Sequence, residues 1–520
     1  MGNLVSIRRR FRASQFFSAC ILVLIASVAP LLQTQSRAAQ VPRLSAKNND
    51  DINVLMIVFD EAMLSPLLRN DGTINRQRFP GFAAVADSST WYRNMLGTSQ
   101  RTTEAVPSIL DGNWPSLKRY PVLRDHPNNL FTYMNGRKEM NVYQAITKLC
   151  PSGACTNAGP EYFRMVHRQV QQFQEVTSRA LTSTKPTLHF AHVLLPHRPW
   201  GLAPDLRLAP DLVQFTDKRS EQLIDRRRDN YQSMLRQYVA TDKLLLDFIT
   251  KLKASPNWDN TMIVVTADHG ITFVPGESYR DKINLNNPGT LEDIYRVPLF
   301  IKYPQQKVGA VSDCPASSID ILATIIATNG DSPTWKTEGV NLRRTCPHRL
   351  SRLVQWPYNS TQLSTSFSAV LERVHYYDKW INADGNVDDI YRVGLSGKLV
   401  GKKTPAVTSH NASISWTLNG SENYQNVGSG PLAPVPTRAS GTLKTETKIC
   451  SRCEGLISVN GKFVGVLPEL AAMTPQMGSL PFSSSLMSRL ILPGVNDVEL
   501  WVADWSSGKA KLIRIGPPTQ

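Results

Sequence analysis

The stretch Asn53-Val-Leu-Met-Ile-Val-Phe59 decides how the rest of the chain is interpreted. It is a continuous run of apolar, β-forming residues, which is typical of a strand buried on both faces of a parallel sheet. Two later runs have the same character, Leu188-His-Phe-Ala-His-Val-Leu-Leu195 and Thr261-Met-Ile-Val-Val-Thr266. The segment between them has the apolar spacing of a helix, carried by Met234, Tyr238, Leu245, Phe248 and Leu252. The order strand, helix, strand predicts an α/β domain.

The alternation of predicted strands and helices continues after these strands and then gives way to a mostly β pattern. Another apolar run, 297–303, precedes a predicted helix over 318–325, so we expect one large α/β domain over residues 51–345 with a mostly parallel central sheet. Stretches 113–185 and 200–230 are expected to form its variable loops. From 346 to 520 the chain predicts a mostly β accessory domain, with a hairpin turn at Asn460-Gly461, strands over 498–502 and 511–515, and a loop over 427–441.

Composition excludes several classes of protein. With 41% hydrophobic and 19% charged residues the 520-residue chain has ordinary globular usage, which excludes a disordered or collagen-like chain. A mean hydropathy of −0.24 excludes a polytopic membrane protein. The formal net charge is +16, but the basic residues are scattered and no basic patch carries interleaved aromatic residues. We therefore expect no nucleic-acid partner. The positive net charge instead indicates attraction to an anionic membrane surface or polymer.

The N-terminus has the features of an export signal. Arg8, Arg9, Arg10 and Arg12 precede an apolar run over 16–25, and small residues follow at 36, 38 and 39. Residues 1–39 are therefore predicted to be a signal peptide or, if uncut, a membrane anchor, and residues 40–50 a linker. The expected location is periplasmic or extracellular, or attached to the membrane by this segment.

The cysteines agree with an oxidising compartment. Apart from Cys20 the cysteines fall into close pairs, which are Cys150/Cys155, Cys314/Cys346 and Cys450/Cys453. These pairs predict disulfides, although six cysteines allow fifteen connectivities. The last pair, spaced CxxC, is also compatible with a redox-active pair or half a metal site, and we favour a structural disulfide.

Polar residues follow three of the predicted strands directly. Asp60-Glu61 ends the first, His197 follows the second, and Asp268-His269 ends the third. Because parallel strands present their carboxyl ends at one sheet edge, these side chains are expected to converge, and oxygen and imidazole ligands together suit a divalent ion such as Zn²⁺ or Mn²⁺. Each alone has an ordinary explanation, since an Asp at a strand end often caps a helix; all three together are less easily explained by chance.

Seven motifs in register resemble the alkaline phosphatase/sulfatase superfamily, in particular the sulfatase-like branch with lipoteichoic acid synthases and phosphoethanolamine transferases. The resemblance covers roughly residues 50–345 and implies an alkaline-phosphatase-like domain. The motifs are 54–61, 79–86, 92–94, 102–112, 195–199, 266–270 and 297–301.

The resemblance implies a threonine nucleophile. Sulfatases of this family oxidise a Cys or Ser to formylglycine, whereas this chain has Thr102-Thr103-Glu-Ala-Val-Pro107 at that place, and threonine cannot form that group. Spacing to Pro107 favours Thr102, with Thr103 as second choice. The alternative is that the two threonines only cap a helix that begins near Glu104.

The same resemblance implies a ligand set and supporting residues. Asp60, Asp268, His269 and Thr102 are expected to hold one divalent ion (Zn, Mn, Mg or Ca), with Glu61 replacing or supplementing Asp60. His197 is expected to steady the ester oxygens or protonate the leaving group. His189 and His192 are weaker candidates, and only one of them can face the site. The further His of lipoteichoic-type enzymes is absent from 271–280, which argues against a second metal and leaves Arg280 to stabilise charge.

Together these features predict an exported, metal-dependent hydrolase or transferase. Its substrate is expected to be a phosphate or sulfate ester, on a lipid or a polysaccharide. The alternative is a catalytically degenerate scaffold that acts as a cell-envelope binding protein.

Overall fold

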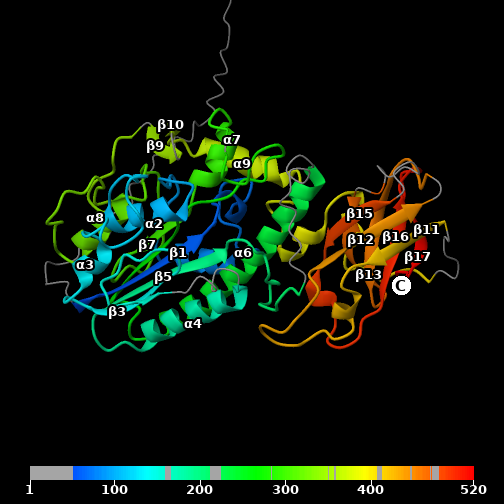
Figure 1. Cartoon of the computed structure of the whole chain (residues 1–520), viewed down its shortest axis with the longest axis horizontal. Helices are drawn as coiled ribbons and strands as arrows, with labels where there is room; N and C mark the ends of the chain where they lie inside the picture. Colours follow the sequence, from blue (N-terminus) through cyan, green and yellow to red (C-terminus); the bar gives the residue numbers. More distant parts are fainter. Residues whose placement is uncertain are drawn as a thin grey trace, which may run out of the picture. The chain divides into compact units, whose positions relative to one another are not determined.

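An eight-stranded sheet forms the centre of the α/β region in the computed structural model (Figure 1). The structure describes residues 51–157, 165–210, 224–282, 284–349, 351–356, 359–406, 413–445, 448–468, 470 and 479–519. The strand order is β4-β3-β5-β1-β6-β7-β2-β8. The strands are β1 (Asn53–Asp60), β2 (Thr90–Tyr92), β3 (Glu139–Gln144), β4 (Thr156–Asn157), β5 (Thr187–Pro196), β6 (Thr261–Ala267), β7 (Leu299–Lys302) and β8 (Ala310–Ser312). Neighbours are parallel except where β7 pairs with β6 and β2, so the predicted mostly parallel sheet is confirmed.

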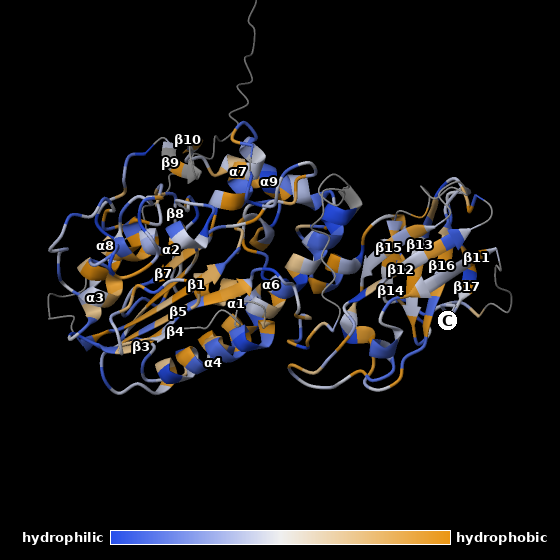
Figure 2. Cartoon of the chain, viewed as in Figure 1, coloured by the Kyte–Doolittle hydropathy of each residue, from blue (hydrophilic) through white to orange (hydrophobic). Residues whose placement is uncertain are grey.

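The three strands that the sequence predicted form the middle of this sheet. β1 lies between β5 and β6, and all three are buried along their whole length. Figure 2 shows these strands as predominantly hydrophobic. Burial on both faces explains why their sequences are continuous apolar runs instead of alternating ones.

Helices cover both faces of the sheet (Figure 1). On one face α4 (Val166–Thr182) and α6 (Ile224–Lys253) contact each other and β5, and α1 (Pro80–Ala86) packs on α6. On the other face α2 (Thr102–Asp111) packs against α3 (Leu130–Met134) and α8 (Asp320–Thr328). The five apolar residues predicted for the long helix are all buried on α6. A further helix, α7 (Pro288–Tyr295), precedes β7.

The expectation that 113–185 forms variable loops is wrong in part, because α3, β3, β4 and α4 lie within it. The buried residues of α4 include Gln169, Gln172 and Thr177. These polar residues interrupt the apolar period of 3.6 that identifies an amphipathic helix.

After residue 345 the chain first contributes to the α/β region and then forms antiparallel sheets. β9 (Ser351–Trp356), β10 (Asn359–Ser364) and α9 (Ser368–Asp378) come first. Two sheets follow, ordered β11-β12-β15 and β14-β13-β16-β17. Their strands are β11 (Ile414–Leu418), β12 (Arg438–Thr445), β13 (Cys453–Val459), β14 (Lys462–Leu467), β15 (Leu480–Ser485), β16 (Val498–Asp504) and β17 (Lys511–Gly516). The mostly β C-terminal region is thus confirmed.

Two details of this region test the sequence interpretation. Asn460 and Gly461 join β13 to β14 with positive φ angles of 48° and 70°, as the predicted hairpin requires. The predicted loop over 427–441 is partly wrong, because β12 begins at Arg438. A Cβ on Gly441 would lie 1.8 Å from the carbonyl oxygen of Thr417 on β11, so glycine there permits close strand approach and does not mark a loop.

The N-terminal predictions fall outside the described residues. This applies to the signal or anchor over 1–39 and to the linker over 40–50. In the described part of the chain, no helix has both the length and the apolar character needed to cross a membrane. The domain limits at 345 and 346 stay a prediction.

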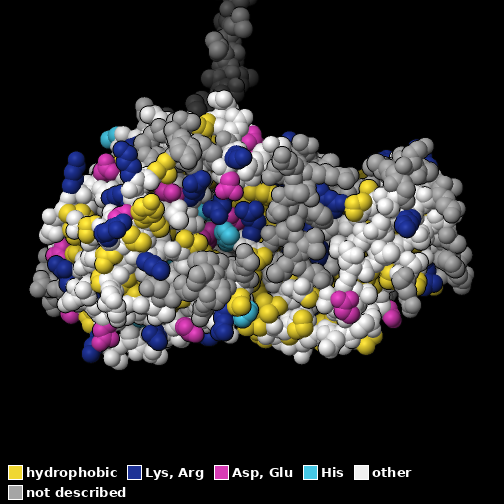
Figure 3. All heavy atoms as spheres, in the orientation of Figure 1, with side chains coloured by type: hydrophobic (Ala, Val, Ile, Leu, Met, Phe, Trp, Pro, Cys, Tyr) yellow, Lys and Arg dark blue, Asp and Glu magenta, His cyan; other side chains and the backbone are white. Residues whose placement is uncertain are grey.

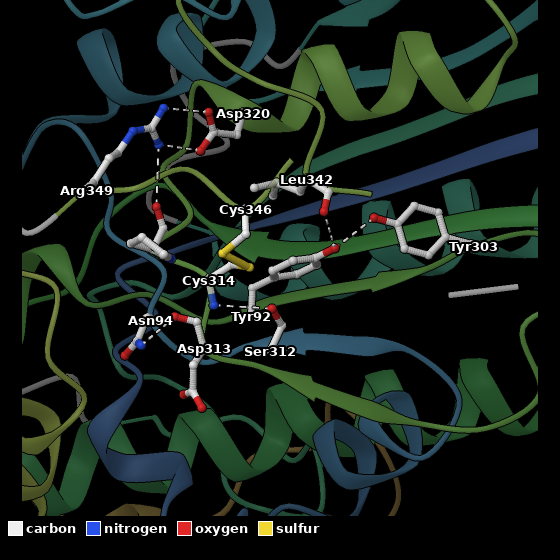
Figure 4. Close-up of a disulfide and its surroundings, with 11 residues drawn as sticks. Tyr92, Asn94, Tyr303, Ser312, Asp313, Cys314, Asp320, Leu342, Cys346 and Arg349 are labelled. Carbon is white, nitrogen blue, oxygen red and sulfur yellow. Dashed lines mark hydrogen bonds and ion pairs between the residues drawn. A yellow bond between two sulfur atoms is a disulfide. The ribbon is translucent and has the colours of Figure 1, made fainter. Parts of the chain in front are cut away.

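The three predicted disulfides are confirmed. Cα–Cα distances are 6.1 Å for Cys150–Cys155, 5.3 Å for Cys314–Cys346 and 5.8 Å for Cys450–Cys453. Figure 4 shows the second bridge beside the sheet edge, where the hydroxyls of Tyr92 and Tyr303 lie 2.9 Å apart. This bridge ties the segment after β8 to the segment after α8.

A buried carboxyl group joins α6 to α1 and is expected to make stability pH-dependent. Asp242 accepts hydrogen bonds from the backbone N–H groups of Gly81 (2.8 Å) and Phe82 (2.7 Å). Burial raises the pKa of Asp242 from 3.8 to about 7, against the opposing effect of these two bonds. Between pH 3.8 and about 7 the folded state therefore keeps a proton that the unfolded chain has lost. Over this range the free energy of unfolding should fall by about 1.4 kcal/mol for each pH unit.

Urea unfolding at several pH values checks this expectation. Asp242→Asn should reduce the slope by the contribution of this one group. Asp247→Asn should keep it, because Asp247 lies on the same helix with a side chain 49% exposed. An unchanged slope in Asp242→Asn would assign the pH dependence to other groups.

Candidate active site

The residues after β1 and β6, one residue within β5 and the first residue of α2 meet at one edge of the sheet. Asp60, Asp268, His192 and His269 are fully buried, and Thr102 is 5% exposed. In the strand register Val58 of β1 pairs with His192 on one side and with Thr266 on the other. Paired residues of neighbouring strands lie on the same face of the sheet, and Val58 shares its face with Asp60, two residues later. His192 therefore lies on the face that carries Asp60.

Two carboxylates and one imidazole form a compact triad. His192 Nε2 lies 3.4 Å from Asp60 Oδ2 and 3.9 Å from Asp268 Oδ2, and ligand atoms of the three residues lie within 4.8 Å of one another. His269 borders this group, with Nε2 3.4 Å from Asp268 Oδ2 and 3.9 Å from Asp60 Oδ1.

Thr102 lies against the triad. Its Oγ1 donates to Asp60 Oδ2 at 3.3 Å and lies 3.2 Å from His269 Nε2. The Nδ1 of His269 faces the carbonyl of Gly270 at 3.0 Å. A donor Nδ1–H leaves a lone pair on Nε2, which Thr102 Oγ1 and, at 2.7 Å, Arg280 Nη1 both approach; this is the tautomer that a base or a metal ligand needs. Thr103 is turned elsewhere, because its hydroxyl donates to Glu104 at 2.9 Å.

The segment after β6 is held by close backbone packing and by α9. Gly270 N donates to the carbonyl of Ile294, and a Cβ on Gly270 would lie 2.1 Å from the carbonyl oxygen of Asp293. Arg373 on α9 donates twice to the buried carboxylate of Asp293, at 2.8 Å each. The same carboxylate accepts from Thr272 at 2.8 Å, so α9 is tied to the chain just beyond Asp268 and His269.

Ionisation in this cluster is strongly perturbed. Burial and the charge of Asp60 raise the pKa of Asp268 well above its ordinary value. Burial would also raise the pKa of Asp60, but the imidazoles of His197, His192 and His269 outweigh it and the pKa is lowered. Burial and the charge of Arg280 lower the pKa of His269 to about 3. Two adjacent buried carboxylates cannot both ionise at low cost unless a cation lies between them.

The unsatisfied atoms fit a divalent cation. Asp60 Oδ1, Asp268 Oδ2 and both ring nitrogens of His192 are buried without a hydrogen-bond partner among the described residues. Leaving such atoms unpaired is costly, and carboxylate oxygens with imidazole nitrogens are ligands that Zn²⁺ and Mn²⁺ accept. The site can therefore hold one ion between Asp60, Asp268 and His192, with His269 and Thr102 beside it.

Basic groups border the site on its open side. Arg280, Arg198 and His197 have side chains 17%, 20% and 22% exposed. Figure 3 shows basic and histidine side chains gathered around acidic ones near the middle of the face in view. Such groups suit an anionic ligand.

Comparison with known proteins adds the family. The sequence model described as Sulfatase matches residues 53–330, more than half of the chain. The chain belongs to the sulfatase family. Sulfatase-family proteins are ester hydrolases of the alkaline phosphatase superfamily, and members of this superfamily use divalent metals, so the predicted superfamily is confirmed. The lipoteichoic acid synthase branch stays a prediction.

No curated protein matches this sulfatase-family chain. Among solved structures, one determined in complex with its substrate D-glucosamine-2-N,6-O-disulfate is 13% identical, covers 61% of this chain and 87% of its own, and has a TM-score of 0.47. A phosphonate monoester hydrolase from Silicibacter pomeroyi is 17% identical, with 58% and 79% covered and a TM-score of 0.42. An alkaline phosphatase superfamily protein from Vibrio parahaemolyticus is 14% identical, with 60% and 75% covered and a TM-score of 0.43.

The structure brings together most residues predicted for this sulfatase-family site. Asp60, Thr102, Asp268 and His269 converge, whereas Glu61 and His197 lie in the neighbouring basic group. His192, only a weaker candidate in the sequence, belongs to the triad, and His189 is bonded away from it to Asn141 at 2.7 Å. The pairing of His192 with Val58, two residues before Asp60, places it in the triad, and this register is seen only in the structure.

Proposed function

We propose that the chain is an exported, divalent-metal-dependent hydrolase or phosphotransferase that acts on phosphate or sulfate esters through a Thr102 nucleophile. The observation that carries the proposal is the position of the Thr102 hydroxyl, 3.3 Å from Asp60 and 3.2 Å from His269 at the edge of the Asp60–His192–Asp268 triad. The +16 net charge suits an anionic substrate, a lipid or polysaccharide ester at a membrane surface among them. The three disulfides support an oxidising compartment, such as the periplasm or the extracellular space.

Thr102 is the first residue of α2, a ten-residue helix. Backbone N–H groups at a helix N-terminus favour negative charge, both on the developing alkoxide and on the bound ester. When bound, a divalent cation would polarise the ester and lower the pKa of the attacking hydroxyl. The proton of Thr102 has two acceptors within reach, Asp60 Oδ2 and His269 Nε2.

The reaction then has two steps. Thr102 Oγ forms a bond to phosphorus or sulfur while the bond to the leaving alcohol breaks, and His197 is proposed to give that alcohol its proton. Water then releases the group from Thr102 in a hydrolase, and an acceptor alcohol does so in a transferase.

A substrate screen tests the proposed function. Nitrophenyl phosphate, bis-nitrophenyl phosphate and nitrophenyl sulfate are incubated with the metal-stripped protein and Zn²⁺, Mn²⁺, Mg²⁺ or Ca²⁺. We expect turnover of at least one ester that a chelator stops and one ion restores. If metal binds but no ester turns over with any ion, the chain is the degenerate binding scaffold instead.

A further inference from the structure

The carboxylate of Glu61 makes contacts of a different kind from those of Asp60. Its Oε1 lies 2.9 Å from Arg280 Nε, 3.5 Å from His197 Nε2 and 3.7 Å from Arg198 Nη2. Its Oε2 accepts from the backbone N–H of Arg198 at 3.4 Å. The carboxyl group of Glu61 is therefore already surrounded by guanidinium and imidazole side chains.

The backbone at Glu61 separates the two neighbouring carboxylates. Glu61 is fully buried and has a φ of 59°, in the left-handed region that a non-glycine residue adopts at a cost of about 1 kcal/mol or more. Asp60 belongs to the triad with His192 and Asp268, whereas Glu61 faces the basic group. Retained strain at the end of β1 agrees with a functional need for this turn.

Arg280 connects Glu61 to the proposed nucleophile. Its Nη1 lies 2.7 Å from His269 Nε2, the same nitrogen that Thr102 Oγ1 approaches at 3.2 Å. Nη1 also donates to the carbonyl of Gln100, and Nη2 lies 3.3 Å from His197 Nε2. The Nε of Arg280 and Oε1 of Glu61 form an ion pair without hydrogen-bond geometry. Arg280 is thus held on one side by Glu61 and reaches the Thr102 region with its other nitrogens.

We infer that Glu61 is a positioning residue and not a metal ligand: it holds Arg280 beside Thr102, where the guanidinium binds the free oxygens of the ester. The part of this inference that concerns ester binding by Arg280 rests on the proposed function. The site then needs only one divalent ion, and Arg280 supplies the second positive centre. Two parallel N–H donors of a guanidinium match two oxygens of a phosphate or sulfate group.

The inference is tested by binding, without turnover. Metal content and affinity are measured with Zn²⁺ or Mn²⁺ by titration calorimetry and elemental analysis, and anion affinity with inorganic phosphate on the metal-loaded protein. Glu61→Gln and Arg280→Met are both expected to retain one ion per chain and to bind phosphate about 10-fold to 100-fold more weakly. The double variant should bind phosphate no more weakly than Arg280→Met alone, because Glu61 acts through Arg280.

Glu292→Gln is the matched control. Glu292 is a buried glutamate paired with Arg296 at 2.6 Å outside the site, so its replacement should leave metal and phosphate binding unchanged. If Glu61→Gln does not fold, Arg280→Met tests the role of Arg280 through the same two affinities, and Glu61→Asp, whose shorter side chain withdraws the carboxylate from Arg280, tests that of Glu61.

Other results would overturn the inference. Loss of the ion in Glu61→Gln would make Glu61 a ligand, and additive losses in the double variant would mean that Glu61 does not act through Arg280. If phosphate binding and its loss follow the expectation but no ester is turned over, the proposed function fails and the positioning role stands.

Discussion

Replacing Thr102 with alanine is expected to reduce ester turnover by about a thousandfold or more while the bound metal is retained. The reason is that no other hydroxyl approaches both Asp60 and His269 among the described residues. Turnover is measured with the ester and ion found in the screen, and metal content on the same sample. Thr102→Ser should keep a measurable part of the activity, because it retains a hydroxyl.

Thr103→Ala is the matched control for Thr102. Its hydroxyl donates to Glu104 and touches neither Asp60 nor His269, so activity should change little. A covalent intermediate gives an independent readout: rapid quenching and mass spectrometry should find a phosphorylated or sulfated peptide that contains residue 102, absent from Thr102→Ala. Full turnover in Thr102→Ala, or a modified Thr103, would refute the assignment.

Disrupting the triad is expected to remove the metal. Asp268→Asn and His192→Ala should each weaken Zn²⁺ or Mn²⁺ binding by about 100-fold or more, and turnover should fall with it. Asp268→Asn removes a negative charge from a fully buried group, and His192→Ala removes the imidazole of the triad. Calorimetric titration of the metal-stripped proteins measures the change.

A control on the same strand separates ligand loss from general damage to β5. His189 is also buried, but it contacts Asn141 and Ser183 and lies away from the triad. His189→Gln should therefore keep metal affinity within about threefold, even if it lowers the melting temperature. If His192→Ala binds metal as the wild type does, His192 is not a ligand and His269 is the imidazole that holds the ion.

Much of the fold and of the site follows from local sequence. The apolar runs of β1, β5 and β6 were predictable because strands buried on both faces need apolar residues throughout. The edge where Asp60, Asp268 and His269 meet was predictable because parallel strands end on the same side. The choice between Thr102 and Thr103 was not, because adjacent residues in a helix point in directions about 100° apart and only packing decides which one faces inward.

His192 and Arg280 mark where local sequence stops being informative. His192 lies within β5, a strand that is apolar on both faces. Such a sequence does not show which residues of the neighbouring strands His192 faces. Arg280 follows a segment whose position depends on packing against α7, α9 and the carboxylate of Asp293.

The order of strands along the chain, the carboxylates and imidazole after them, and the paired cysteines were set by the sequence alone, since each depends on residues near one another. The strand register, the antiparallel β7 and the separation of Glu61 from Asp60 were decided by the tertiary structure. Those features depend on contacts between residues far apart in the chain, where packing and charge compensation choose among arrangements that local sequence permits equally.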